Sequence, residues 1–344
     1  MESDDLRVLP KAELHQHLDG SMRPETAVEL AEAADMSLTL DEARQRMVGP
    51  ERCADQADLL GYFDLPIELL QTDVALERVA AELVEDLAAD GITYAEIRWA
   101  PRLHLERGLG VPAVIEAVAH GVERARRELG TSAPLIGLIV TAMRQHPPAA
   151  NADLARRAAD IGRPVVAFDL AGPEAAWPAP PHAIAFVTAR EGGLALTAHA
   201  GEVAGPERVR EVLEFGVRRV AHGVVAKDDP TLLDQLRTRD VTLDLCPTSN
   251  VQAGIVPSFA EHPLAALHRA GVSVTISTDE RTVTDTTLTH ELARCFRELG
   301  LARSELAAIV LNGFDRAFAP SAAVAPLRAA AAHAWQAWAE GPIN

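Results

Sequence analysis

Two histidines near the start of the chain, His15 and His17, are spaced so that they could bind one metal ion. They belong to the segment Lys-Ala-Glu-Leu-His-Gln-His-Leu-Asp-Gly-Ser at 11–21. Residues two apart in an extended strand point to the same face, so both imidazoles would converge on one side. Such a pair is weak evidence by itself. It is strengthened by three later segments, which are His-Ala-Gly-Glu at 199–202, Ala-His-Gly at 221–223 and Ser-Thr-Asp-Glu at 277–280.

Together these segments offer three imidazole nitrogens and a carboxylate, a ligand set that suits zinc. The expected ligands of this single ion are His15, His17, His199 and Asp279. Water bound to such an ion loses a proton near neutral pH and becomes a nucleophile. Glu202 could then hold a proton for the attacked or leaving group, while His222 could accept the water proton or stabilise the hydroxide. Taken singly, Glu202 could also be a helix N-terminal carboxylate and Asp279 a helix cap.

Short apolar segments alternate with amphipathic helical segments along most of the chain. The pattern predicts eight strands, at 12–18, 92–99, 135–142, 165–170, 194–199, 219–222, 241–245 and 272–278. It predicts helices between them, for example at 75–89, 112–129, 206–215, 230–237 and 263–269. Several of these helices have proline at or near their first position and glycine just beyond their end, as helix termini favour.

Repeated strand–helix units favour parallel pairing with right-handed crossovers, and eight of them predict an α/β fold of the (β/α)₈ TIM-barrel type. An open doubly wound sheet is the alternative, but the sequence has no Gly-x-Gly-x-x-Gly turn and no Walker-type phosphate loop to support it. The carboxyl ends of barrel strands share one mouth. The candidate ligands and His222 lie late in a predicted strand, at its end or just after it, so we expect them to meet there.

Two regions lie outside this alternation. The first crossover, from 24 to 71, is too long for one helix, and we expect an inserted helical subdomain that forms a lid over the mouth of the barrel. The Ala-rich tail from 321 to 340 reads as a helix, with Trp335 and Trp338 packing on the outside of the barrel. We expect residues 1–344 to form a single domain that contains the insertion.

The amino-acid composition indicates which classes of binding partner to expect. Of 344 residues, 48% are hydrophobic and 24% charged, as in a folded soluble protein, and the net charge of -18 disfavours nucleic acid and anionic membranes. Cys53, Cys246 and Cys295 are widely spaced, which indicates neither a disulfide framework nor a thiolate zinc site. The acidic start, with no apolar stretch after it, predicts a cytoplasmic protein without a signal peptide.

Lysine usage bears on the number of metal ions. The only lysines are Lys11 and Lys227, and neither follows the fourth predicted strand, where Phe-Asp-Leu-Ala-Gly stands at 168–172. Barrel hydrolases with two bridged metals commonly use a carbamylated lysine there, so we expect one metal ion per chain.

The chain resembles the adenosine deaminases of the amidohydrolase superfamily over nearly its full length. The matching motifs are Lys-Ala-Glu-Leu-His-x-His-Leu-x-Gly-Ser at 11–21, Asp-Leu-Ala-Gly-x-Glu at 169–174, Thr-Ala-His-Ala-Gly-Glu at 197–202, Arg-Val-Ala-His-Gly at 219–223, Cys-Pro-Thr-Ser-Asn at 246–250 and Ser-Thr-Asp at 277–279. The other zinc deaminase architecture, with His-x-Glu and Pro-Cys-x-x-Cys ligands, is not matched.

This resemblance implies a zinc-dependent enzyme that deaminates adenosine or 2′-deoxyadenosine to the inosine product and ammonia. It implies the four metal ligands named above, a proton on Glu202 for purine N1, and assistance from His222 to the attacking hydroxide. It further implies that the main-chain N–H of Gly172 contacts purine N3 and that His17 and Asp19 contact the ribose.

One departure from the animal pattern concerns the base. Glu280 and Arg281 stand where that pattern has aspartate and proline, and this second aspartate normally contacts the purine near N7. Glu280 is therefore a candidate substrate contact with an added methylene. It leaves open a second substrate class, namely adenine or a modified adenosine such as aminodeoxyfutalosine. A third possibility, an inactive nucleoside-binding barrel, is disfavoured by the intact set of ligands and acid–base residues. The oligomeric state is open.

Overall fold

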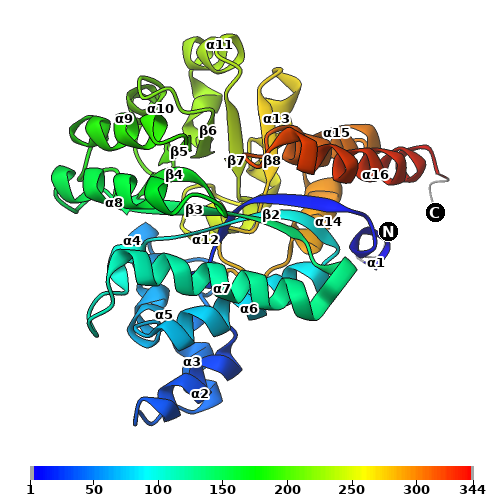
Figure 1. Cartoon of the computed structure of the whole chain (residues 1–344). Coiled ribbons are helices and arrows are strands. Elements are labelled where there is room, and N and C mark those ends of the chain that lie inside the picture. The colour runs from blue at the N-terminus through cyan, green and yellow to red at the C-terminus, as the bar shows by residue number, and fades with distance from the viewer. Residues whose placement is uncertain (1–3, 342–344) are drawn as a thin grey trace.

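The computed structural model describes residues 4–341, and eight parallel strands form a nearly closed barrel at its centre (Figure 1). The strands follow one another around the barrel in chain order. Their bounds are β1 Lys11–His17, β2 Ile92–Trp99, β3 Leu135–Met143, β4 Val165–Ala171, β5 Ala195–Ala200, β6 Arg219–His222, β7 Thr242–Leu245 and β8 Ser273–Ile276. An isolated bridge between Gln16 and Asp279 joins the last strand segment to the first. The predicted (β/α)₈ barrel is confirmed.

Helices connect the strands and cover the outside of the barrel (Figure 1). They are α6 Asp73–Ala89, α7 Val111–Leu129, α8 Pro148–Ile161, α9 Ala183–Glu191, α10 Pro206–Leu213, α11 Pro230–Thr238 and α13 Leu264–Arg269. The short helix α12 Pro247–Gln252, between β7 and β8, lies at the mouth of the barrel instead. All five helices predicted as examples are present, with ends displaced by one or two residues. Proline occupies the first or second position of α7, α8, α10, α11 and α12, where its missing N–H costs no helical hydrogen bond.

The largest boundary error concerns the last strand, which ends at Ile276 rather than at Thr278. Beyond that point hydrogen bonds that involve side chains join this segment to β1. The backbone N–H of Thr278 donates to Oε1 of Glu13 at 2.9 Å, and the hydroxyl of Ser277 accepts from the N–H of His15 at 3.2 Å. The segment that carries Asp279 is thereby fastened to the strand that carries the histidine pair.

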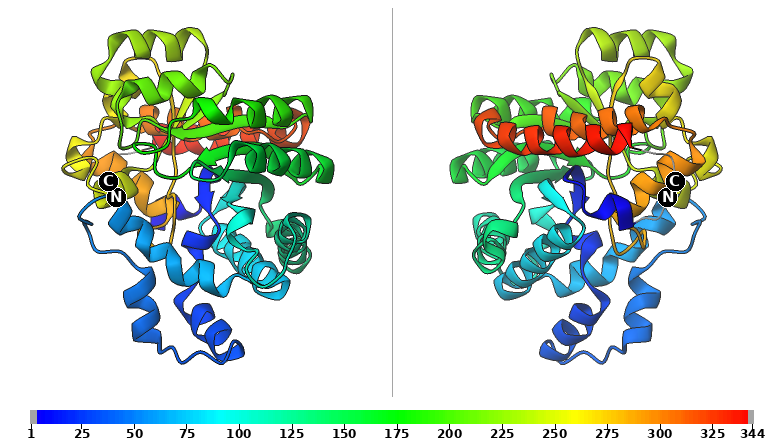
Figure 2. Two further views of the ribbon diagram at one scale, coloured as in Figure 1. Left: turned by 90° about the vertical axis from the view of Figure 1, so that its left-hand side faces the viewer. Right: turned by 90° about the vertical axis from the view of Figure 1, so that its right-hand side faces the viewer.

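The insertion after β1 is helical, as predicted, and extends away from the barrel (Figures 1 and 2). It contains α2 Pro24–Ala33, α3 Leu40–Met47, α4 Gln56–Leu60 and α5 Asp64–Leu69. Its middle is tied to loops at the carboxyl end of the barrel, because the Gly49 N–H donates to the Val283 carbonyl at 2.9 Å and the Cys53 N–H to the Gln252 carbonyl at 2.7 Å. This part of the insertion therefore lies at the barrel mouth.

At the two ends of the chain, α1 Asp4–Arg7 precedes β1, and α14 Leu288–Glu298, α15 Arg303–Asp315 and α16 Ser321–Glu340 follow β8. The last helix lies on the outside of the barrel (Figure 2), and its buried Trp335 donates from Nε1 to the Pro10 carbonyl at 2.8 Å. The predicted position of the tail is confirmed. Within residues 4–341, every helix is too short or too polar to cross a membrane.

Charged residues fill part of the barrel interior below the mouth. Arg219 pairs with Glu96 at 2.5 Å and with Asp244 at 3.0 Å, and Arg98 pairs with Asp169 at 3.3 Å. All five side chains are almost completely buried. Removing one partner of such a buried pair costs about 3–5 kcal/mol, because it leaves the other charge without compensation. This network supports the residues at the mouth from beneath.

Candidate active site

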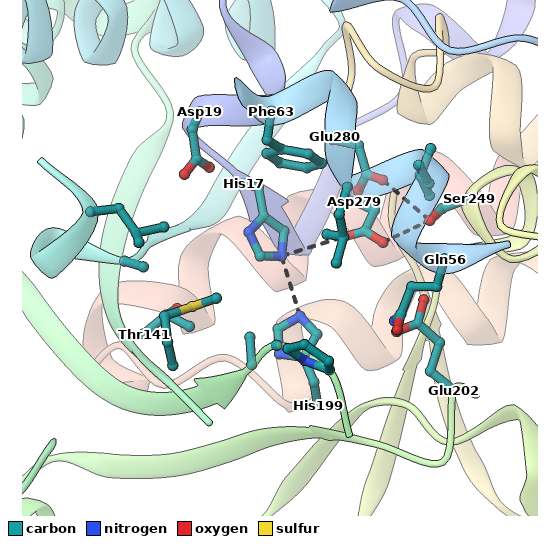
Figure 3. Close-up of a pocket in the computed structure, with 18 of the residues that line it drawn as sticks. His17, Asp19, Gln56, Phe63, Thr141, His199, Glu202, Ser249, Asp279 and Glu280 are labelled. Carbon is teal, nitrogen blue, oxygen red and sulfur yellow. Dashed lines mark hydrogen bonds and ion pairs between the residues drawn. The ribbon is translucent and has the colours of Figure 1, made fainter. Parts of the chain in front are cut away.

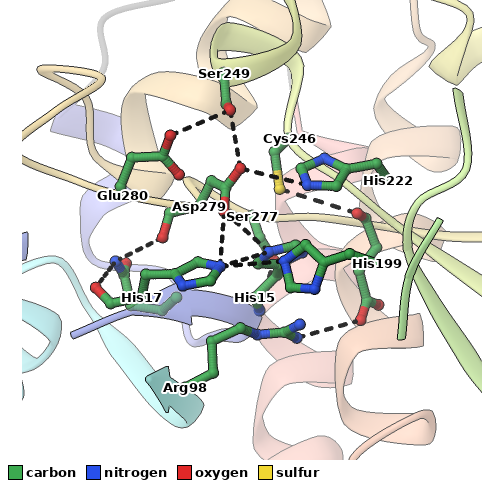
Figure 4. A network of polar contacts seen from close by, with 12 residues as sticks. His15, His17, Arg98, His199, His222, Cys246, Ser249, Ser277, Asp279 and Glu280 are labelled. Atoms are coloured by element: carbon green, nitrogen blue, oxygen red, sulfur yellow. Dashed lines mark hydrogen bonds and ion pairs between the residues drawn. The ribbon is translucent and has the colours of Figure 1, made fainter. Parts of the chain in front are cut away.

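The histidine pair lies at the carboxyl end of β1, with both rings on the same face as the strand geometry requires. The Nε2 atoms of His15 and His17 are 3.3 Å apart. His199, at the end of β5, brings its Nε2 to 3.2 Å from that of His17. Asp279 adds a carboxylate oxygen, Oδ1, at 2.9 Å from His15 Nε2 and 3.3 Å from His17 Nε2 (Figures 3 and 4). The four residues predicted as ligands are thus together.

These spacings fit a single metal ion. In a tetrahedral shell with ligands about 2.0–2.1 Å from zinc, neighbouring ligand atoms lie about 3.3 Å apart. The four contacts in the cluster measure 2.9, 3.2, 3.3 and 3.3 Å. Nitrogen atoms of neutral imidazoles that converge on one another need a shared cation or proton between them. The donor set and its geometry therefore suit the predicted ion.

The backbone of the fourth candidate ligand, Asp279, is held in an unusual conformation. Asp279 has a φ of +70° and His222 a φ of +66°, both in the left-handed region that residues with a side chain rarely adopt. Backbone hydrogen bonds maintain this conformation at Asp279, since its N–H donates to the His15 carbonyl at 3.1 Å and its carbonyl accepts from the His17 N–H at 2.6 Å. Strain of this kind clusters at functional sites, where the surrounding structure determines the position of the side chain.

A buried carboxylate fixes the orientation of His199. Asp169, in β4, lies 3.1 Å from Nδ1 of His199 and also contacts Arg98. Because Nδ1 donates to Asp169, the lone pair of Nε2 faces the cluster, as in other carboxylate–histidine–metal arrangements. Burial by itself would raise the pKa of Asp169, but His199 and Arg98 hold that pKa below its usual range. Asp169 is consequently ionised.

The turn after β5 presents Glu202, and a second glutamate shapes that turn. The carboxylate of Glu174 accepts four consecutive backbone N–H groups, from Gly201 at 2.8 Å, Glu202 at 2.8 Å, Val203 at 2.6 Å and Ala204 at 2.9 Å. Four charge-assisted hydrogen bonds to one buried carboxylate hold this turn in a single conformation. The direction in which Glu202 leaves the backbone is set by this arrangement.

The side chain of Glu202 is buried and faces the cavity (Figure 3). Its Oε2 accepts a hydrogen bond from Nε2 of Gln56, in α4 of the insertion, at 2.5 Å. Burial raises the pKa of Glu202 well above its ordinary value, and the negative charges of Asp279 and Glu174 raise it further. A carboxyl group that stays protonated near neutral pH can serve as a general acid.

His222, at the end of β6, points toward the same space. Its Nε2 lies 3.7 Å from Oε1 of Glu202 and 3.7 Å from Oδ2 of Asp279. Both distances exceed a direct hydrogen bond, so a small oxygen atom could lie between these groups. Burial lowers the pKa of His222 to about 4, which keeps the ring neutral under ordinary conditions.

A cavity of about 290 Å³ opens beside the cluster (Figure 3). The insertion supplies an apolar part of its wall through Leu59, Leu60 and Phe63, and the ends of the strands supply the rest. Asp19 and Gly172, which the sequence predicted as substrate contacts, both line this cavity. Gly172 has a φ of +104°, a conformation that favours glycine.

Glu280 also lines the cavity, whereas its neighbour Arg281 turns away from it. The Glu280 carboxyl accepts from the Ser249 hydroxyl at 3.4 Å, and burial together with the charge of Asp279 raises its pKa well above the ordinary value. Arg281 pairs with Glu13 at 3.4 Å and with Asp90 at 3.2 Å. The departure at Arg281 is therefore a structural anchor, and only Glu280 bears on the pocket.

Several residues of the site were not predicted from the sequence. They are Gln56, Asp169, Glu174, Ser249, Asn250 and His262. Two recognised motifs contain four of them, since Asp169 and Glu174 begin and end the segment 169–174 and Ser249 and Asn250 close the segment 246–250. Those motifs were available signals for these four positions. Gln56 and His262 carry no such signal, because only the folded chain brings them near Glu202 and Asn250.

An eight-stranded parallel barrel with three imidazoles and an aspartate at its mouth defines a metal-dependent hydrolase of the amidohydrolase type. The chain belongs to the adenosine deaminase family, whose model, described as adenosine deaminase, matches residues 10–331. Enzymes of this family are hydrolases that deaminate purines.

Individual relatives agree with this assignment. An adenosine deaminase of Enterococcus faecalis is 37% identical over 321 residues, which are 92% of this chain and 94% of that protein. Among solved structures, an adenine deaminase from Arthrobacter aurescens superposes with a TM-score of 0.88 at 25% identity, covering 97% of this chain and 100% of the other. An amidohydrolase from Burkholderia ambifaria with bound zinc gives a TM-score of 0.87 at 25% identity and covers 98% and 93% of the two chains.

Proposed function

We propose that this enzyme hydrolyses adenosine and 2′-deoxyadenosine to inosine and 2′-deoxyinosine, with release of ammonia, and that it uses one zinc ion. The observation that carries this proposal is the juxtaposition, beside one cavity, of the buried Glu202 carboxyl group with four side chains that could together hold a metal ion. Relatives named adenosine deaminase, at 36–38% identity over at least 90% of the chain, support the substrate.

The ion would be held by Nε2 of the three histidines and Oδ1 of the aspartate in the cluster, namely His15, His17, His199 and Asp279. When bound, it supplies Lewis acidity that activates water for attack on C6 of the purine. The contact between His199 and Asp169 keeps the histidine nitrogen available for the ion. A zinc-bound structural relative supports the identity of the metal.

In this proposal Glu202 is the general acid and base. Its proton passes to purine N1, which makes C6 more electrophilic. Of the two protons of the attacking water, one restores the Glu202 carboxyl and the other leaves with the amino group as ammonia. His222, with Nε2 at 3.7 Å from Oε1 of Glu202, assists the attacking oxygen.

The cavity favours a nucleoside. Asp19 is 4% exposed and its Oδ1 has no hydrogen-bond partner within residues 4–341, so a ribose hydroxyl would supply the missing donor. We assign His17 to the same end of the substrate, the Gly172 N–H to purine N3, and Glu280 to the base near N7. The cavity-lining residues of the described chain include neither arginine nor lysine, which disfavours a nucleotide because its phosphate would lack a positive partner.

Free adenine is the second candidate substrate. Its support is the structural similarity to an adenine deaminase, together with the longer carboxylate at Glu280. The two candidates differ in their use of the Asp19 end of the cavity, which adenine would leave without a ligand. The ratio of their kcat/KM values therefore separates them.

The test is a substrate comparison with the metal quantified. Zinc-loaded protein is given adenosine, 2′-deoxyadenosine, adenine and AMP, and both the loss of absorbance and the release of ammonia are followed. We expect preference for the nucleosides. Glu202→Gln should retain zinc and lose most turnover, because the ligands remain while the proton donor is gone. No turnover of any of the four compounds by fully loaded protein would refute the proposal.

A further inference from the structure

Three buried hydrogen bonds run in series behind His222, which is the group proposed to face the attacking oxygen. The backbone N–H of Leu264 donates to Nδ1 of His262 at 3.2 Å. Nε2 of His262 lies 3.1 Å from Oδ1 of Asn250, and Nδ2 of Asn250 lies 3.2 Å from Nδ1 of His222. The side chains of this series are almost completely buried, so solvent does not compete for these contacts.

The direction of every bond in the series follows from its first member. A backbone N–H can only donate, so Nδ1 of His262 is an acceptor and carries no proton. The proton of the His262 ring is then on Nε2 and is donated to the Asn250 carbonyl oxygen. The other end of the Asn250 amide is its NH₂ group, which donates to Nδ1 of His222. That atom is an unprotonated acceptor as well.

We infer that Asn250 and His262 are positioning residues that fix the tautomer of His222, so that His222 donates a hydrogen bond from Nε2 to the attacking oxygen. Since Nδ1 accepts the Asn250 N–H, the proton of the neutral ring must be on Nε2. This Nε2–H points into the space between Glu202 and Asp279. A ring in this state cannot also accept a proton at Nε2. Of the two roles considered for His222, the hydrogen-bond arrangement selects stabilisation of the oxygen.

A pair of residues outside the site provides a matched control. Asn151, in α8, is buried and places Nδ2 at 3.0 Å from Nδ1 of His182, whose Nε2 is 3.0 Å from the Arg144 carbonyl. The chemistry is the same as at Asn250 and His222, because the carbonyl forces a proton onto Nε2 of His182. Neither residue lines the cavity. Asn151→Asp therefore buries a carboxylate against Nδ1 of a histidine, as Asn250→Asp does, but at a pair of residues that does not line the cavity.

The first test measures the tautomer directly in zinc-loaded wild-type protein. Histidine labelled with ¹⁵N gives distinct nitrogen shifts for protonated and unprotonated ring atoms, and the signals of His222 are assigned by their loss in His222→Gln. We expect Nδ1 unprotonated and Nε2 protonated. The opposite pattern overturns the inference. This result does not depend on whether the enzyme accepts the proposed substrate.

The second test reverses the tautomer, and it rests on the proposed function. Asn250→Asp removes the donor to Nδ1 and supplies an acceptor, so the ring proton moves to Nδ1 and Nε2 becomes bare. We expect kcat to fall by about 10²–10³, as when a stabilising donor to a developing oxyanion is removed. KM and zinc content should change little, and Asn151→Asp should retain kcat within a few-fold. An Asn250→Asp enzyme with wild-type kcat refutes the inference, whereas an inactive wild-type enzyme refutes the proposed function.

Discussion

Replacing Glu174 by glutamine tests whether this buried carboxylate holds the proton donor in place. Oε1 of Glu174 accepts three of the four backbone N–H groups in the turn, and Oε2 accepts the N–H of Gly201 at 2.8 Å. Glutamine preserves one acceptor oxygen but turns its NH₂ group toward another donor. One charge-assisted bond is lost, and a buried N–H is left without a partner.

The expected loss of stability in Glu174→Gln follows from these contacts. Loss of a hydrogen bond to a charged group costs about 1.5–3 kcal/mol, and an unpaired buried N–H costs about 1–3 kcal/mol. These two costs partly describe the same lost interaction, so they do not add in full. We expect the free energy of unfolding to fall by about 2–4 kcal/mol. At roughly 2.1 cal/mol/K per residue, a chain of 344 residues has an unfolding entropy of about 0.7 kcal/mol/K. The melting temperature should therefore drop by about 3–6 °C.

Activity supplies the decisive measurement. A displacement of about 1 Å at Glu202 is expected to lower kcat by roughly 10²-fold. The charge of Glu174 also raises the pKa of Glu202, so its removal lowers that pKa. In the proposed mechanism Glu202 acts in its protonated form, so activity is lost as pH rises through this pKa. The basic limb of the pH profile should accordingly move to lower pH in Glu174→Gln.

Glu207→Gln is the matched control, since Glu207 is exposed in the first turn of α10, directly after the same loop. It removes an equal charge without disturbing the four N–H groups, and it should leave kcat and the pH profile unchanged. If Glu174→Gln is destabilised and yet keeps both the wild-type kcat and the wild-type basic limb, then Glu174 does not position the proton donor.

Three further changes probe other contacts. Gln56→Leu removes the N–H that stabilises ionised Glu202, so the pKa of Glu202 should rise and the basic limb of the kcat profile should move to higher pH. The control is Gln45→Leu, at an exposed position in α3. A basic limb that does not move in Gln56→Leu would contradict the contact between Gln56 and Glu202. His15→Ala should purify with little zinc and without activity, because a ligand of the ion is lost; full metal occupancy by elemental analysis would show otherwise. Glu280→Asp withdraws the carboxyl group from the cavity and should lower kcat/KM for adenosine about tenfold, which is the effect of one lost hydrogen bond. Equal kcat/KM values for the variant and the wild-type enzyme would show that Glu280 does not contact the base.

Local sequence patterns were sufficient to predict the barrel, because alternating strands and helices admit few arrangements once parallel pairing and right-handed crossovers are required. They were also sufficient to nominate the metal ligands. His15 and His17 are two apart on a strand, and each further candidate ligand lies near or just beyond the end of a strand of its own. Residues at the carboxyl ends of parallel strands share one edge whatever their separation in sequence. The meeting of residues 15, 199 and 279 could thus be expected from their positions alone.

Tertiary structure decided how these residues are held and which protons they carry. Gln56 reaches Glu202 from a segment 146 residues away, and Asp169 selects the free nitrogen of His199 from a different strand. The tautomer of His222 depends on Asn250 and, through it, on His262. Such contacts depend on side-chain direction and burial, which no periodicity encodes. The sequence determined which chemical groups gather at the barrel mouth, whereas the packing of the insertion and of α12 against them determined their ionisation and orientation.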